Sequence, residues 1–241
     1  MKGENRMKCK KILSAVLSGA VVLSTVYSGP MIEAAAADAD QSVVPVAAYE
    51  FEGSIGEGTE ALVTGLGAYG GELSYGEGRD GGQAIQLGDY GLKLNHENLG
   101  ENYTVSMWVK PDTGLIDNMA VLFLGYHDPQ KWTGIAGVAN NGEACKVWTH
   151  DGSAYSWSEV TKLDVPTGEW TQLTLAQSGD QLSAYVNGKL IKSGGASRAL
   201  VGENQDIYLG VNYWDPEFTG LVDDVKIYDQ ALTADQVAAQ Y

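Results

Sequence analysis

From residue 46 onward, short runs of alternating apolar and polar residues are interrupted about every ten residues by Gly, Asn or Asp. A period of two is typical of a strand with one buried face. Short strands at this spacing predict a sandwich or a barrel. The clearest run is 103–110, in which one face carries Tyr103, Val105, Met107 and Val109 and the other carries Thr104, Ser106, Trp108 and Lys110.

The turns between the runs indicate antiparallel hairpins. Ser178-Gly179-Asp180 separates two runs, and Asn187-Gly188 is among the strongest short hairpin signals. Thr233 with Gln236 three residues later forms a capping box, which predicts a short C-terminal helix. The sequence therefore predicts an all-β, antiparallel two-sheet sandwich with further strands at 121–125, 134–138, 144–150, 170–176, 181–187, 206–212 and 221–228.

The first 37 residues have the order of a secretory signal peptide. Five basic residues and one acid lie in 1–11, an apolar run follows in 12–29, and Ala34-Ala-Ala-Ala37 offers a cleavage site. A membrane anchor is the alternative, but the apolar run contains four Ser, one Thr and two Gly and is short for a span. We expect a removable segment at 1–37, a short lead-in at 38–45 and one domain at 46–241.

Acidic residues dominate the chain. It has 15 basic and 31 acidic residues, which give a formal net charge of −16. Residues 1–37 hold five of the basic and two of the acidic residues. The rest of the chain therefore has 10 basic and 29 acidic residues and a net charge of −19. Such a surface repels phosphate backbones and anionic lipids, so it argues against nucleic acid and membrane partners. It suits a secreted protein and offers carboxylates to calcium.

Cys145 is the one cysteine that remains after removal of 1–37, so we expect no internal disulfide. It begins an apparent strand, and Lys146 is the only base near it in the sequence. A buried structural thiol is therefore favoured over a reactive one.

Four segments, taken in order, resemble the laminin G-like domains of the concanavalin A-like superfamily. The resemblance spans about 46–241 and implies a jelly roll of two antiparallel sheets. Leu209-Gly-Val-Asn-Tyr-Trp-Asp215 is similar to modules attached to secreted bacterial enzymes that degrade polysaccharides. The four segments are Tyr49-Glu-Phe-Glu-Gly53, Gly82-Gln-Ala-Ile-Gln-Leu87, Tyr103–Lys110, and an ending that runs from Gly168-Glu-Trp170 through Tyr185-Val-Asn-Gly188 to Gly220–Leu232.

The resemblance implies glycan binding, although the same fold serves adhesion domains and some glycosidases. Hydrolases of this fold carry an E-x-D-x-x-E or similar strand motif, which the sequence lacks. Its close acid pairs are Glu50/Glu52 at the start of the domain and Asp223/Asp224, whose side chains would point to opposite faces. We expect a secreted, extracellular bacterial module that binds a poly- or oligosaccharide without catalysis and works with a glycoside hydrolase. A protein-interaction or adhesion domain and a glycosidase with an unrecognised site remain alternatives.

The resemblance also implies a structural calcium ion held by Glu52, Asp223 and a carbonyl near Gly82. Asp223 shares its phase with Leu221, Val225 and Ile227, so its side chain is expected on the apolar side, where a lone carboxylate is costly unless it is paired or metal-bound. Glu50 is an alternative ligand to Glu52. In the other interpretation, Asp223 accepts hydrogen bonds from loop amides and no ion is present. Asp224 is expected to be a solvated surface residue.

Aromatic residues supply the candidate glycan site, because the C–H face of a sugar stacks on an indole or phenol ring. Several of the tryptophans fall in expected turns, and exposing several aromatic rings together costs solubility unless they serve an interface. For each single tryptophan, packing is the alternative, and Trp108 and Trp170 match positions of the family that look architectural. We expect saccharide contacts from Trp132, Trp148, His150, Trp157, Asn212 and Trp214.

Overall fold

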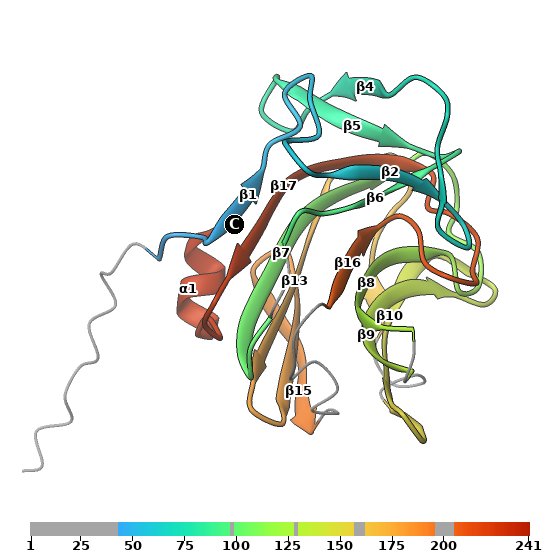
Figure 1. Cartoon of the computed structure of the whole chain (residues 1–241). Helices are drawn as coiled ribbons and strands as arrows, with labels where there is room; N and C mark the ends of the chain where they lie inside the picture. Colours follow the sequence, from blue (N-terminus) through green and yellow to red (C-terminus); the bar gives the residue numbers. More distant parts are fainter. Residues whose placement is uncertain (1–42, 97–98, 128–129, 157–161, 196–204) are drawn as a thin grey trace, which may run out of the picture. The chain divides into compact units, whose positions relative to one another are not determined.

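Two antiparallel sheets and one short helix make up the described part of the chain in this computed structural model, which covers residues 43–96, 99–127, 130–156, 162–195 and 205–241 (Figure 1). All of these residues belong to one compact unit, 38–241. The all-β two-sheet prediction is confirmed. None of the helical structure in the described ranges has the length and apolar character of a membrane span.

The first sheet has the strand order β15-β14-β13-β7-β17-β5-β4, with β1 also paired to β17. The first and last strands of the domain are therefore hydrogen-bonded neighbours, with Ala47 opposite Ile227 and Tyr49 opposite Val225. The strands are β1 (Ala47–Tyr49), β4 (Ser74–Glu77), β5 (Gln83–Leu87), β7 (Asn102–Pro111), β13 (Thr171–Ser178), β14 (Gln181–Val186), β15 (Lys189–Gly195) and β17 (Gly220–Tyr228).

The second sheet has the order β11-β10-β9-β8-β16-β6-β2-β3, with β12 also paired to β10. Its central strands are longer than predicted and are joined in simple antiparallel succession. The strands are β2 (Glu60–Val63), β3 (Gly67–Ala68), β6 (Gly91–Lys93), β8 (Ala120–Tyr126), β9 (Lys131–Val138), β10 (Asn141–Asp151), β11 (Tyr155–Ser156), β12 (Leu163–Asp164) and β16 (Asp206–Leu209).

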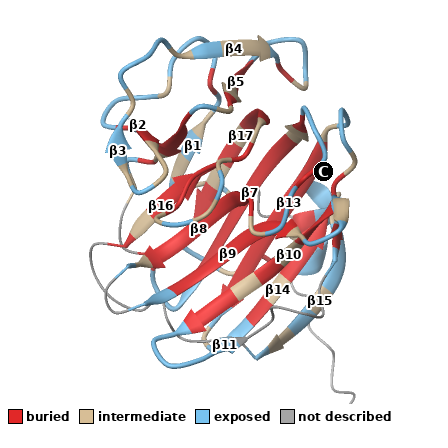
Figure 2. Cartoon of the chain, turned by 90° about the vertical axis from the view of Figure 1, so that its right-hand side faces the viewer, coloured by how far each residue is buried: buried red, intermediate tan, exposed pale blue. Residues whose placement is uncertain are grey.

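The main hydrophobic core draws buried residues from the central strands of both sheets, which are buried along most of their length (Figure 2). All four apolar residues predicted to share a face of 103–110 belong to this core. Cys145 is also fully buried in it, and burial raises the pKa of its thiol to about 12. The prediction of a buried structural thiol is confirmed.

The helix α1 (Ala234–Ala239) begins at the predicted capping box. The Thr233 hydroxyl accepts from the Gln236 amide, and the Gln236 side chain accepts from the Thr233 amide. Val237 and Leu232 pack against Tyr185, Tyr228 and Ala176 on the outside of the first sheet. The helix therefore covers part of that sheet's outer face.

A bulge in β17 corrects the predicted orientation of Asp223. The register with β7 shifts between Asp223 and Lys226, and Asp224 has a positive φ of 47°. The extra residue lets Val222 and Val225 both enter the core, so Asp223 lies on the opposite, outer side, paired with Trp108. The prediction from phase was wrong because simple alternation cannot count an unpaired residue.

Two further strands differ from their predicted bounds. The strand predicted at 134–138 begins earlier, so Trp132 lies inside β9. After β16, Gly210 has a φ of 69° and ends the alternation, so Val211 leaves the phase of Leu209 and joins a cluster outside the main core. The segment that follows folds back over the second sheet.

Candidate functional site

The outer face of the second sheet carries an aromatic cluster that is separate from the main core. Phe123 of β8 and Tyr208 of β16 lie on this face because both of their strand neighbours enter the core. Trp132 of β9 joins the same cluster, and Trp148 of β10 packs against it. We call this surface the aromatic face. Besides those four rings, it includes Leu62, Val211, Leu66 and Tyr213, and the ring contacts add His127, His150, Tyr155 and Trp214.

Trp132 lies at the centre of the aromatic face. It packs edge-on against Trp148 with 5.3 Å between ring centroids, and it stacks on His150 at 6.1 Å. Its centroid lies 6.0 Å from those of Phe123 and Tyr155 and 6.3 Å from that of Trp214. Offset and edge-to-face pairs of this kind are each worth about 0.5–1.5 kcal/mol beyond area burial. Trp132 itself is only 6% exposed, so it supports the face and offers at most an edge to a ligand.

The exposed rings lie on either side of Trp132. Trp214 is 42% exposed and Tyr155 is 55% exposed, while Trp148 is half-buried. A flat aromatic surface left open to water and held in place by other rings is suited to stacking against the apolar face of a sugar.

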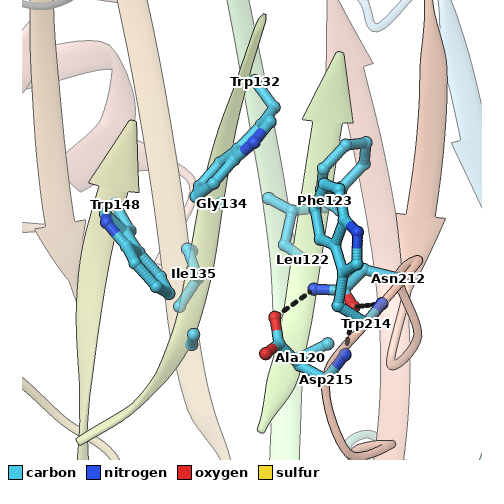
Figure 3. Close-up of a pocket in the computed structure, with 11 residues that line it drawn as sticks. Ala120, Leu122, Phe123, Trp132, Gly134, Ile135, Trp148, Asn212, Trp214 and Asp215 are labelled. Atoms are coloured by element: carbon cyan, nitrogen blue, oxygen red, sulfur yellow. Dashed lines mark hydrogen bonds between the residues drawn. The ribbon is translucent and has the colours of Figure 1, made fainter. Parts of the chain in front are cut away.

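A hollow opens between these rings (Figure 3). Its floor is Gly134, which lies opposite Phe123 on one side and opposite Trp148 on the other, so the missing side chain leaves a gap between two aromatic rings. The enclosed volume is about 10 Å³, which is room for one water. The hollow is therefore too small to enclose a sugar ring. The other lining residues are Ala120, Leu122, Trp132, Ile135, Ala136, Asn212, Trp214 and Asp215.

Asn212 fixes the loop that carries Trp214. Its Oδ1 accepts from the amides of Trp214 at 2.9 Å and Asp215 at 2.8 Å, and its Nδ2 donates to Asp215 Oδ2 at 2.8 Å. Asn212 is buried, and it lines the hollow. Through these hydrogen bonds, Asn212 mainly positions Trp214 and Asp215.

A turn after β2 holds the same loop from the other side. The Thr64 hydroxyl donates to the Asp215 carbonyl at 3.0 Å, and the Thr64 amide donates to Glu217 Oε1 at 2.8 Å. Burial alone would raise the pKa of Glu217, but the hydrogen bonds from Thr64 outweigh it and lower that pKa. Glu217 therefore stays ionised, and keeps its bond, well below neutral pH.

His150 lies on the aromatic face beside Trp132, as its shared phase with Trp148 predicted. It is buried, its Nδ1 lies 2.6 Å from the Gln130 carbonyl, and the Gly152 amide donates to the same nitrogen at 3.0 Å. The indole N–H groups of Trp132 and Trp148 are buried without a hydrogen-bond partner among the described residues. An ordered water or a ligand hydroxyl would satisfy them. Trp157 lies outside the described residues.

The predicted metal ligands also meet in one place. Glu52, Gly82 and Asp223 line a hollow together with Glu50, Asp80 and Asp224; we call it the carboxylate hollow. Asp223 is only 7% exposed and accepts from the Arg79 amide at 2.9 Å and the Asp224 amide at 2.8 Å. Glu52 accepts from the Gln83 amide at 2.9 Å.

The carboxylate hollow gathers oxygen donors of the kind that a hard cation such as calcium uses, but no three metal-ligating side chains among the described residues are placed to hold an ion together. Burial raises the pKa of Asp223, as do the charges of Asp224 and Glu52, while the two amide bonds lower it in part. A Cβ on Gly82 would collide with the Glu52 carboxylate, so glycine at this position is what allows that carboxylate to approach. A bound cation would relieve the repulsion of Asp223 by Asp224 and Glu52. Carboxylates and backbone carbonyls are also the oxygen donors that calcium prefers.

Arg79 partly neutralises the carboxylate hollow. Its guanidinium pairs with Asp80 and with Asp224 at 3.2 Å, and it lies 4.5 Å above the ring of Trp108. Asp224, expected to be solvated, is thus a partly buried member of an ion-pair cluster that also includes Lys226. Trp108 stacks in turn on Tyr241, consistent with an architectural role.

The predicted saccharide contacts omitted several residues of the aromatic face. Asp215, Phe123 and Gly134 line the hollow, and Tyr155 is its most exposed ring. Gly134 looked like an ordinary strand glycine, and its importance depends on which residues lie opposite it in two neighbouring strands. Phe123 carried a usable signal, since it alternates with two core leucines in β8.

Comparison with known proteins identifies the family. The model of the concanavalin A-like lectin/glucanases superfamily matches residues 80–238. The chain belongs to this superfamily. A search of curated protein sequences found no significant match.

Among solved structures of the superfamily's fold, one similar structure is domain 4 of AbnA, a GH43 extracellular arabinanase from Geobacillus stearothermophilus, in complex with arabinotriose. It is 29% identical, with a TM-score of 0.68 over 81% of this chain and 97% of that domain. The receptor-binding domain of botulinum neurotoxin D is 14% identical, with a TM-score of 0.58 over 82% of this chain and 52% of that one.

The binding domain of Paraclostridial Mosquitocidal Protein 1 is 16% identical, with a TM-score of 0.53 over 77% of this chain and 47% of that one. The chain thus spans about half the length of both toxin domains. At these identities the toxin domains share the fold alone.

Proposed function

We propose that this protein is a non-catalytic carbohydrate-binding module that attaches a glycoside hydrolase to its polysaccharide. The aromatic face carries the proposal: the exposed rings of Trp214 and Tyr155 flank a fully packed Trp132, beside a hollow lined by Asn212 and Asp215. Rings fixed in this way bind a sugar without further loss of side-chain entropy.

The chemistry of the aromatic face favours binding over hydrolysis. Among the described residues that line the hollow, Asp215 is the one carboxylate, whereas glycoside hydrolysis ordinarily uses a pair. Its Oδ2 is already engaged by Asn212 at 2.8 Å. This arrangement orients a ligand and lacks the second group that a hydrolytic mechanism needs.

The similar arabinanase domain suggests the first ligand to test. That domain belongs to an extracellular enzyme and was solved with arabinotriose. Together with the signal-like order of residues 1–37, this supports a secreted protein that binds arabinan or a related plant polysaccharide. A partner hydrolase, in the same protein or beside it, completes the proposal.

Affinity gel electrophoresis through arabinan, galactan, xylan and β-glucan tests the proposed function. We expect retardation by at least one polymer, and at least about tenfold weaker retardation of Trp214→Ala, since an interface aromatic commonly contributes more than 1.4 kcal/mol. Trp170→Ala, a half-buried tryptophan outside the aromatic face, is the matched control and should migrate as wild type. Unretarded migration of the wild type in every gel would contradict the proposal.

We also propose that the carboxylate hollow holds a structural calcium ion. The ion would bridge Glu52, in the turn after the first strand, to Asp223 in the last strand, and so fasten the two ends of the domain. Thermal unfolding with calcium chloride and with a chelator tests this: saturating calcium should stabilise the fold by about 2–4 kcal/mol. Glu52→Gln should lose most of that gain, whereas Glu77→Gln, exposed at the end of β4, should keep it. Equal unfolding temperatures in calcium and chelator would exclude the ion.

A further inference from the structure

Asp215 is the one charged side chain among the described residues that line the hollow, and no salt bridge joins it to a cation in the described ranges. Figure 3 shows its carboxylate directed from the loop toward the space beside Trp148 and Ile135. Oδ2 accepts from Asn212, and Oδ1 has no partner among the described residues. The side chain is half-buried, so its charge is poorly screened at the mouth of the hollow.

The two lysines beside this surface are each already paired. Lys146 lies 4.6 Å above the ring of Trp148, but its ammonium donates to Asp117 at 3.1 Å and to Asn118 at 2.8 Å. Lys93 lies 2.9 Å from Asp206, which also accepts from the Tyr213 hydroxyl at 2.8 Å. Neither lysine is therefore free to neutralise Asp215, and Glu217 adds a second negative charge to the same loop, on a chain whose formal net charge is −16.

We propose that Asp215 contacts the ligand and makes the aromatic face selective for neutral saccharides against those that carry uronic acids or other anions. This inference rests on the proposed function and names its ligand class. A free carboxylate oxygen accepts hydrogen bonds from sugar hydroxyls, and charge-assisted bonds of this kind are the strong ones. The same charge repels a sugar carboxylate stacked on Trp214 or Trp148.

Electrostatics sets the expected size of the selectivity. Two like charges about 10 Å apart near a protein surface repel by enough to weaken binding roughly tenfold. About 1 M salt reduces the Debye length to about 3 Å and should remove most of that penalty. Stacking and neutral hydrogen bonds carry no net charge, so binding of the neutral ligand should depend little on salt.

The test uses one neutral polysaccharide that the protein retains, in two derivatised forms. Carboxymethyl groups add charge, and hydroxyethyl groups add similar bulk without charge. We expect wild type to bind the carboxymethyl form roughly tenfold more weakly than the hydroxyethyl form at low salt, with the difference closing in about 1 M sodium chloride.

Two variants assign the selectivity to one carboxylate. Asp215→Asn should weaken binding of the neutral form, since a charge-assisted bond is lost, and should narrow the ratio between the two forms. Asp180→Asn, in the turn between β13 and β14 of the other sheet, changes the net charge by the same unit and should leave the ratio unchanged.

Two other results would contradict the proposals, each in a different way. If the wild type binds both derivatives equally, or Asp215→Asn keeps the full ratio, charge selectivity by Asp215 is wrong while saccharide binding stands. If no neutral polysaccharide is retained at all, the proposed function fails and this inference fails with it.

Discussion

On the aromatic face, Trp132 packs against five other rings, whereas at the junction of the first and last strands five carboxylates line one hollow. The rings attract one another and exclude water, so they assemble without a ligand. The carboxylates repel one another, and Arg79 offsets only part of that repulsion. The comparison implies that packing alone holds the aromatic face in shape, whereas the carboxylate hollow would need a cation, as proposed, to balance its charges.

The largest expected effect is the loss of the central ring. Trp132→Ala removes a buried indole with contacts on every side, and truncations of this kind cost about 3–5 kcal/mol. Denaturant unfolding should therefore show a much lower midpoint, with saccharide binding weakened in the fraction that stays folded. Trp170→Ala, the half-buried control, should cost far less. If the two variants unfold alike, the aromatic face is not self-supporting.

The second prediction concerns the charge of Asp223. Its folded-state pKa is raised, so without a cation the ionised form costs stability above that pKa, and the cost fades as pH falls through it. A bound calcium ion would favour the ionised carboxylate of Asp223. It would therefore lower the pKa of Asp223, and ionisation would then stabilise the fold. Carbon-13 NMR titration of the Asp223 carboxyl should give a pKa above the ordinary value in chelator and below it in calcium. A pKa that calcium does not move would show that no ion binds beside Asp223.

The smallest effect is expected for the support of the Trp214 loop. Thr64→Val removes the hydroxyl that donates to the Asp215 carbonyl, at a cost of about 1 kcal/mol, and keeps the side-chain shape. Saccharide affinity should fall a few-fold because Trp214 is held less firmly, while the unfolding midpoint changes little. Ser183→Ala, which removes a hydroxyl pair with Ser193 on the other sheet, is the control for affinity. If Ser183→Ala loses saccharide affinity while Thr64→Val keeps it, a positioning role for Thr64 is contradicted.

Much of the fold follows from local patterns in the sequence. The alternation in 103–110 correctly predicts which side of β7 enters the core, and the capping box at Thr233 correctly predicts where α1 begins. The turn at Asn187-Gly188 separates β14 from β15 as expected. These features are local, because strand phase, capping and tight turns depend on residues close together in the chain.

The site was less predictable, because backbone irregularities and long-range pairing decide it. The bulge at Asp224 reverses the face of Asp223, and the positive φ of Gly210 breaks the alternation that was extended to Asn212. Gly134 matters only through its partners Phe123 and Trp148 in two neighbouring strands. Periodicity along one strand contains neither the register between strands nor the position of an unpaired residue.

The most direct measurement of saccharide binding at the aromatic face follows the indole N–H signals of the tryptophans by nitrogen-15 NMR while arabinotriose is added. We expect shifts for Trp132, Trp148 and Trp214, which line the hollow, and unchanged signals for Trp108 and Trp170. Shifts confined to Trp108 or Trp170 would place the ligand elsewhere on the molecule. Unchanged signals for all five at saturating ligand would contradict a saccharide site on the aromatic face.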